Sequence, residues 1–222
     1  MQRATAGRPR SFSSDELDTR VRLAAAGEFS RHGYDAATVD AIVAASGVSK
    51  PVLYRAFGSK SRLYCTLLER FATDLAATAM RSFGNHRGSG EMDRIDQFRL
   101  IIDSWFGVLE ERPDEWKMLN TATSTDPQVR ATLERLRSMQ LRNDVIMIRT
   151  FLPELPEGEV EPIAEAIRGS LIAIGTWWLA NRHIDRNVAV NAMTRLCAGL
   201  FAVTTAAHPP SSSKKSVRPH RR

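Results

Sequence analysis

The sequence has little cysteine and no long apolar run. Its 222 residues include only two cysteines, Cys65 and Cys197, and both lie in apolar stretches of helical periodicity. Buried, reduced thiols in a cytoplasmic protein are the ordinary reading of such cysteines. No run of about 18 apolar residues occurs, and the first ten residues lack the apolar core of a secretory signal. We therefore expect a cytoplasmic protein that has no membrane partner.

Histidine is also sparse, and its spacing argues against an enzyme. None of the five histidines lies three or four residues from another, and no Glu-x-x-His sequence occurs. A di-iron or haem site in a helical protein would need such pairs or inward axial ligands. Neither cysteine has a neighbouring metal ligand, and no Ser/His/Asp set can be singled out. We expect no catalytic residues, no metal site and no cofactor.

Acidic residues are missing from one long stretch. None occurs between Asp40 and Glu69, where the basic residues are Lys50, Arg55, Lys60 and Arg62. The segment before Asp15 carries +3 and the tail after Ala207 carries +5, so the rest of this +6 chain is acidic. Basic charge confined in this way favours a polyanionic partner at one end of the molecule. For the tail, a role in solubility alone is the alternative.

The same stretch has the pattern of two short helices joined by a tight turn. Thr38 is a plausible N-cap, and Ala41, Ile42 and Ala45 give the first helix an apolar face. Gly47 can take the positive φ that a sharp turn needs. Ser49 and Pro51 begin the second helix, and Gly58 ends it. Such a pair can place its second helix in a DNA major groove, but it equally fits a helical hairpin with a solvated basic face.

A longer set of residues distinguishes a DNA-binding helix pair from an ordinary helical hairpin. From Ala25 the chain runs A25-A26, F29, G33-Y34, T38-V39, I42, G47-V48-S49, L53-Y54, F57, S59-K60, L63. This run resembles the DNA-binding domain of TetR-family transcriptional regulators and covers about the first third of the chain. The Val43-Ala44 pair departs from the usual order but keeps the apolar face.

The resemblance implies an all-α fold of about nine helices in two parts. We expect a basic arm over residues 1–12, a helix-turn-helix head over 13–58, and a helical effector-binding and dimerisation domain over 59–207, followed by a disordered basic tail over 208–222. Ser13 to Glu16 form a capping box for the first helix of the head. The helix from Ser59 towards Phe83 leaves the head and can act as a lever. Pro162 is expected to open the penultimate helix, Ile163 to Asn181, after a connection over 153–161.

Roles on DNA follow from the resemblance, position by position. Residues Ser49, Lys50, Pro51 and Val52 match positions that face base edges. Lys50 can donate to guanine, while Pro51 and Val52 can touch a thymine methyl. Thr38, Tyr54 and Lys60 match positions that hold phosphates, and Arg55 lies on the same exposed side.

The last two helices are apolar on more than one side, so each needs two partners. In TetR-like proteins they pair with their copies as a four-helix bundle, which implies a homodimer. The predicted interface residues are Ile167, Leu171, Ile174, Trp178, Leu196, Leu200 and Val203. A buried core within a monomer is the alternative.

The resemblance further implies a small effector within the body. Residues that could line an apolar cavity are Trp105, Phe106, Leu109, Trp116, Met118, Met139, Met147, Phe151 and Trp177. Plain core packing is the alternative for each of them. An apolar cavity favours a hydrophobic or amphipathic effector, and the helix layout is also similar to that of lipid-responsive members. Repression of an inverted-repeat operator is the expected function; activation, or a helical module that binds no DNA, is the alternative.

Overall fold

A computed structural model describes residues 13–86 and 93–207 of the chain. Within these ranges it contains helices and no strands, which confirms the predicted all-α fold. The nine described helices are α1 (Ser14–Ala36), α2 (Val39–Ser46), α3 (Lys50–Phe57), α4 (Lys60–His86), α5 (Arg94–Glu111), α6 (Pro113–Asn120), α7 (Pro127–Phe151), α8 (Glu157–Ala180) and α9 (Arg186–Ala207). The predicted basic arm and tail lie outside the described residues.

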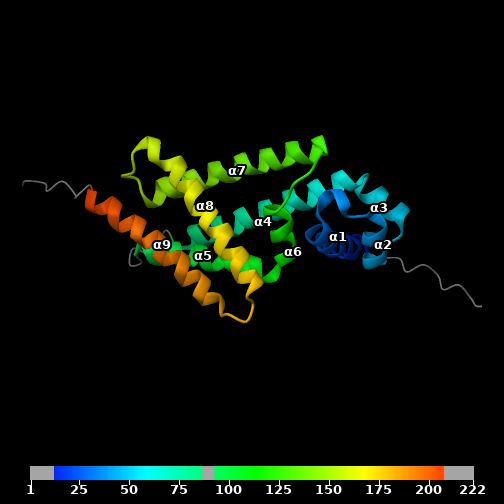
Figure 1. Ribbon diagram of the computed structural model, residues 1–222, viewed down its shortest axis with the longest axis horizontal. Helices are drawn as coiled ribbons and strands as arrows, with labels where there is room; N and C mark the ends of the chain where they lie inside the picture. The colour runs from blue at the N-terminus through cyan, green and yellow to red at the C-terminus, as the bar shows by residue number, and fades with distance from the viewer. Residues whose placement is uncertain (1–12, 87–92, 208–222) are drawn as a thin grey trace, which may run out of the picture.

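The head of the molecule consists of α1, α2 and α3, gathered at one end (Figure 1). Its helix boundaries follow the local signals of the sequence. Ser13 and Glu16 form the predicted capping box, and the Thr38 hydroxyl accepts from the Ala41 backbone N–H at 3.2 Å. Gly47 adopts φ 68° at the turn between α2 and α3, a conformation that favours glycine. The turn is therefore encoded by a single residue.

Helix α4 extends from the head into the body, as the lever prediction requires. Its first half contributes Leu63, Tyr64 and Leu67 to the apolar cluster of the head. Further along the helix, Phe71 and Leu75 belong to the apolar cluster of the body. Figure 1 shows α4 running from the head into the body of the elongated molecule. One helix is therefore packed in both clusters.

The predicted start of the penultimate helix is wrong. Helix α8 begins at Glu157, so Pro162 lies inside it and residues 157–161 are helical. The physical reason is that Leu155 and Val160 are buried in the body cluster, with 6% and 2% of their surface exposed. Their burial favours a packed first turn over the connection that proline and acidic residues suggested. A smaller error concerns Ala45 of α2, which is exposed and not part of the apolar face.

Candidate DNA-binding face and effector cavity

Helix α3 has one buried side and one exposed side. Leu53 is completely buried and Val52 is half-buried, so these residues attach the helix to the head. Ser49, Lys50, Pro51, Tyr54 and Arg55 are all exposed. Ser49 occupies the N-cap position, but its side chain makes no capping hydrogen bond. The predicted base-facing and phosphate-facing residues of α3 therefore lie together on a free surface, with Val52 at its edge.

Lys50 does not extend freely into solvent. Its Nζ donates to Asp40 Oδ1 of α2 at 2.7 Å, and this hydrogen bond raises the pKa of the lysine above its ordinary value. Both side chains are well exposed. An exposed ion pair of this kind is weak, so it leaves Lys50 free to exchange Asp40 for another partner.

Lys60 and Thr38 have structural roles beside any role on DNA. The Lys60 Nζ donates to the Asp35 carbonyl at 3.2 Å and lies 4.6 Å from the centroid of the Tyr34 ring. The Thr38 hydroxyl already caps α2. Substitution of either residue will therefore change the head itself, apart from any effect on DNA binding.

The head is joined to the body by a set of polar contacts. The Tyr34 hydroxyl donates to Asp126 at 2.8 Å, and this hydrogen bond lowers the pKa of the Asp126 carboxyl. Asp126 also accepts from backbone N–H groups at the start of α7. On the opposite side of the junction, Ser30 of α1 donates to Asp114 of α6 at 2.7 Å. Helix α1 is thus hydrogen bonded both to the start of α7 and to α6.

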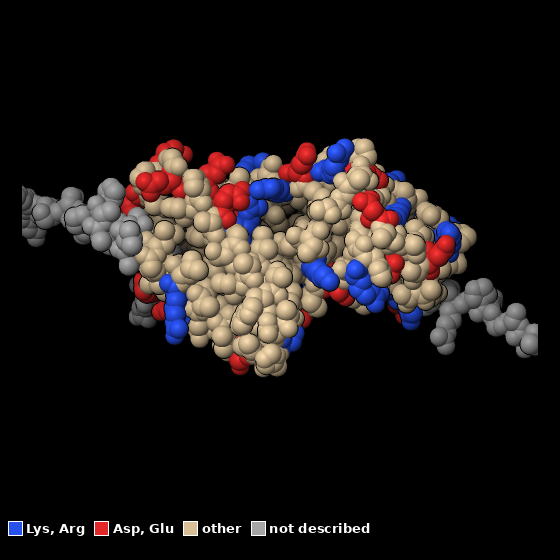
Figure 2. All heavy atoms as spheres, viewed as in Figure 1, with Lys and Arg blue, Asp and Glu red and all other residues tan. Residues whose placement is uncertain are grey.

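The body contains two adjoining chambers. The first, called here the polar chamber, encloses about 700 Å³ of space, part of it open to solvent. Its lining includes apolar residues of α4, α5 and α8 together with Asn120, Gln140 and Asn143. The second, the apolar chamber, is lined by residues such as Phe98, Ile101, Ile148 and Ile167. Trp105, Asp144, Met147 and Arg168 line both chambers, so these residues lie in the wall between them. Figure 2 shows the surface hollowed beside α7, with charged side chains near the opening.

The structure brings together only some of the predicted cavity residues. Trp105, Trp116 and Met147 line the chambers. Phe106, Leu109 and Phe151 are buried in the body cluster without lining either chamber. Met118 and Met139 pack with the cluster of the head, and Trp177 is 45% exposed on α8. The sequence could not show which aromatic and methionine side chains line a cavity and which are packed in the core.

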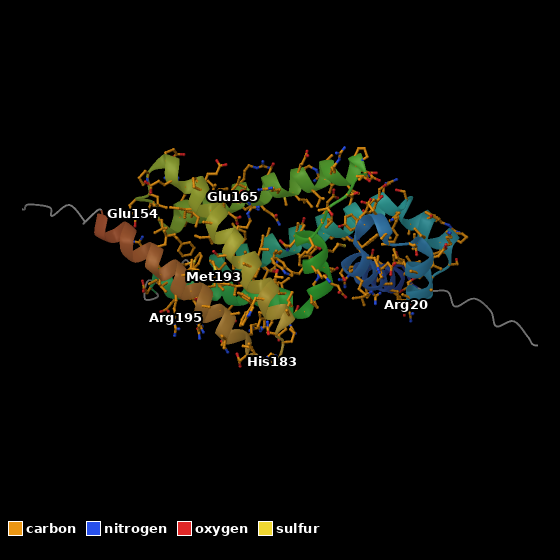
Figure 3. The ribbon with its side chains drawn as sticks, in the orientation of Figure 1. Arg20, Glu154, Glu165, His183, Met193 and Arg195 are labelled. Carbon is orange, nitrogen blue, oxygen red and sulfur yellow. The ribbon has the colours of Figure 1, made fainter. Side chains whose placement is uncertain are left out.

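Sequence reasoning missed Asp144 and Arg168, the two charged residues of the chamber lining. A signal was available, because Glu165 and Arg168 are the only charged residues from Ile163 to Ala180. Figure 3 labels Glu165 on α8, the helix that packs against α7. A charge on an otherwise apolar helix is kept only where it has a partner or a function.

The outer surface of α8 and α9 is apolar or uncharged over a wide area (Figure 2). Trp177 of α8 and Val188 and Leu196 of α9 are exposed by 45%, 49% and 53%. Of the predicted interface residues, Trp178 is buried inside the protomer and donates from Nε1 to the Ile184 carbonyl at 3.0 Å. Ile167, Leu171, Ile174 and Leu200 are half-buried against the body cluster, and the side chain of Val203 lies outside the described residues. The exposed position on α8 is therefore Trp177 and not Trp178.

Comparison with known proteins identifies this arrangement. Residues 22–65 match the family model for bacterial regulatory proteins of the tetR family. Residues 22–65 thus belong to the TetR family of bacterial regulatory proteins. It is 26% identical over 187 residues to the transcriptional activator FasR of Mycolicibacterium smegmatis, a match that covers 83% of each chain. It is also 26% identical over 157 residues to the transcriptional repressor ComR of Escherichia coli, covering 70% of this chain and 71% of ComR.

The TetR fold extends through the body. A TetR-like regulator from Rhodococcus superposes with a TM-score of 0.70 at 21% identity, covering 86% of this chain and 99% of that one. A TetR-family regulator from Streptomyces coelicolor gives a TM-score of 0.61 at 21% identity over 88% of this chain and 85% of its own. The head plus helical body is thus the shared architecture of the TetR regulators.

The described residues contain neither a membrane-spanning helix nor a cluster of metal ligands. None of the helices in residues 13–86 and 93–207 combines the length and apolar character needed to cross a bilayer. The same ranges contain no group of three or more His, Cys, Asp or Glu side chains that could hold a metal ion.

Proposed function

We propose that this TetR-family regulator binds an inverted-repeat operator as a homodimer and represses transcription until a small apolar or amphipathic effector releases it. The observation that carries the proposal is the exposed face of α3, where Lys50, Tyr54 and Arg55 project from a helix held to the head by Leu53. A short helix presented after a glycine turn has the size and charge to enter a major groove.

The dimer is supported by the uncharged outer surface of α8 and α9. Large exposed apolar side chains such as Trp177 and Leu196 are unusual on a surface that stays in water. Gly169 and Ala173, which precede Trp177 at four-residue spacing on α8, are small and exposed and would let two helices approach closely. A second copy of the chain would cover this face through a twofold interface and would present two heads to successive half-sites.

Release by an effector is supported by the way that the chambers and the head share helices. Ala72, Leu75 and Ala79 of α4 line the polar chamber, and the same helix is packed in the head through Leu63 and Leu67. A ligand that binds one tilt of α4 better than another shifts the heads between two arrangements. Activation by the ligand-bound form is the alternative, since FasR and ComR are named an activator and a repressor.

The decisive experiment is selection of bound fragments from the source genome by purified protein, followed by footprinting and fluorescence anisotropy on the selected site. We expect a footprint with twofold symmetry and an affinity that falls steeply with salt concentration. Tyr54→Ala should weaken binding to specific and unrelated DNA alike, because a phosphate contact does not read sequence. Absence of any selected sequence at low ionic strength, with the protein folded, would favour a helical module that binds another acidic partner.

A further inference from the structure

The wall between the two chambers contains a pair of opposite charges that is incompletely hydrogen bonded. Arg168 Nε lies 3.5 Å from Asp144 Oδ2, which is close enough for an ion pair. Both atoms are nevertheless buried and lack a hydrogen-bond partner. The other end of the Arg168 guanidinium is held by Glu165, one turn earlier on α8. One buried donor and one buried acceptor therefore remain side by side in the lining of both chambers.

A buried polar atom without a partner destabilises the folded state, and each such group requires an explanation. A ligand group that reaches this pair would supply the missing hydrogen bonds. A hydroxyl group can donate to Asp144 Oδ2 and accept from the Arg168 Nε–H with one oxygen. The adjoining chamber walls are apolar, from Ile101 and Ile148 on one side to Leu75 and Ile172 on the other. They suit a hydrocarbon frame that carries such a group.

The charges around this position select against an ionised ligand. Asp144 and Arg168 are the only charged residues that line the described chambers, and Glu165 adds a second carboxylate behind the arginine. Three ionised groups of this kind sum to −1. A ligand carboxylate would add a further negative charge to a poorly solvated site, and a ligand ammonium would face the guanidinium. A neutral group that both donates and accepts avoids both costs.

We propose that the effector is a neutral, mainly apolar molecule with a hydroxyl group, and that this hydroxyl bridges Asp144 and Arg168 between the two chambers. The inference rests on the proposed function, because it names the chemical class that would occupy the effector cavity. It also makes Asp144 and Arg168 the residues that determine ligand specificity, whereas Trp105 and Met147 provide the apolar contact.

The test uses the full chain and four compounds with alkyl chains of nine or ten carbons and different head groups: 1-decanol, methyl decyl ether, decanoate and decylamine. Binding is followed by fluorescence, because Trp105 and Trp116 line the polar chamber, and by isothermal calorimetry. We expect 1-decanol to bind about ten- to a hundredfold more tightly than the other three, the range expected for hydrogen bonds to charged groups. Stronger binding of decanoate or decylamine, equal binding of the ether, or no binding of any compound up to its solubility limit would overturn the proposal.

Variants test the two residues directly. In Asp144→Leu/Arg168→Met the preference for 1-decanol over the ether should disappear, while exposed Arg142→Ala on α7 should keep it. A persistent preference in the double variant would overturn the assignment, and if that variant does not fold, the comparison on the wild-type chain still decides. DNA binding is measured on the same samples without any compound. If the wild-type chain binds no operator but prefers 1-decanol, only the proposed function is overturned. If it binds the operator but shows no preference for 1-decanol, only this inference is overturned.

Discussion

Arg22 of α1 donates to Glu115 of α6 across the junction of head and body, with 2.9 Å between Nη1 and Oε1. Glu115 is buried, and its other partner is Arg112 at the start of α6. The next residue, Trp116, lines the polar chamber. Neighbouring positions of one short helix thus contact the head and the chamber, so a ligand that displaces Trp116 also displaces an attachment of α1.

Removal of this attachment should reduce the coupling between ligand and DNA. In Arg22→Gln, Glu115 keeps Arg112, so the protein should lose only about 1 kcal/mol of stability. Operator affinity without ligand should stay within about twofold of wild type, whereas the factor by which 1-decanol weakens operator binding should fall by about 2- to 30-fold, equivalent to 0.5–2 kcal/mol of coupling. Fluorescence anisotropy with and without the compound measures both quantities.

The matched control is Arg31→Gln. Arg31 is also on α1, but its acidic partner Glu28 belongs to the same helix, so this substitution removes an ion pair within α1 and not one to α6. We expect its ligand response to equal that of wild type. An unchanged response in Arg22→Gln as well would show that α6 does not transmit the signal and would leave α4 as the route.

Local features of this fold could be predicted from sequence because neighbouring residues determine them. The capping box at Ser13 and the positive φ of Gly47 depend on a few adjacent residues. The Arg22–Glu115 contact joins residues 93 apart in sequence, and nothing in either segment indicates the other. The pairing of Asp144 with Arg168 likewise exists only after α7 and α8 have packed. The head could therefore be derived from sequence, and the polar part of the cavity could not.

The failure at Pro162 has the same origin. A proline followed by an apolar run is typical of a helix start, and that local rule placed the start too late. The residues that decide the matter, Leu155 and Val160, are buried against helices that are distant in sequence. Similarly, helical periodicity alone could not decide whether Trp177 or Trp178 faces outwards.

Specific reading of DNA should depend on Lys50. Lys50→Ala should cost about 1–3 kcal/mol at the preferred base pair and relax the preference at that position, because a side-chain contact to a base edge is lost. Asp40→Asn should act in the opposite direction. It removes the carboxylate that holds Lys50 and that repels phosphates, so affinity for all DNA should rise by up to about fivefold.

Competition binding against a library of single-base operator variants measures both effects. Arg137→Ala, an exposed arginine of α7 in the body, controls for the loss of one positive charge. If Lys50→Ala weakens all sequences equally, the lysine contacts phosphate and not a base. If Asp40→Asn leaves affinity unchanged, the ion pair does not compete with DNA.

The assembly should depend on the exposed face of α8 and α9. Leu196→Glu places a charge where we propose that a second copy packs, and a buried unpaired charge costs several kcal/mol. The wild-type chain should sediment as a dimer of 24.7 kDa protomers, and the variant as a monomer. Leu23→Glu is the control, since Leu23 of α1 is 61% exposed but lies outside this face. A monomeric wild type at micromolar concentration, or a dimeric Leu196→Glu protein, would contradict the proposed interface.

The stability of the protein should depend on pH through Asp144. Burial raises the pKa of this carboxyl from 3.8 to about 6, and Arg168 only partly offsets the effect. Between these two pH values the folded state binds more protons at Asp144 than the unfolded state does. This group's contribution to the free energy of unfolding therefore falls as pH rises from about 4 to 6.

Asp144→Asn keeps the shape of the side chain and removes its titration. The variant should gain stability relative to wild type as pH rises, by about 1 kcal/mol at pH 7, because the side chain is still about one-third exposed and solvent screens part of the full effect. Urea unfolding at pH 4.5, 5.5 and 7 measures the difference. Asp96→Asn on α5 controls for the loss of an exposed carboxylate. A difference between wild type and Asp144→Asn that is the same at all three pH values would mean that Asp144 is solvated, and the unfilled hydrogen bonds at Arg168 would then need another explanation.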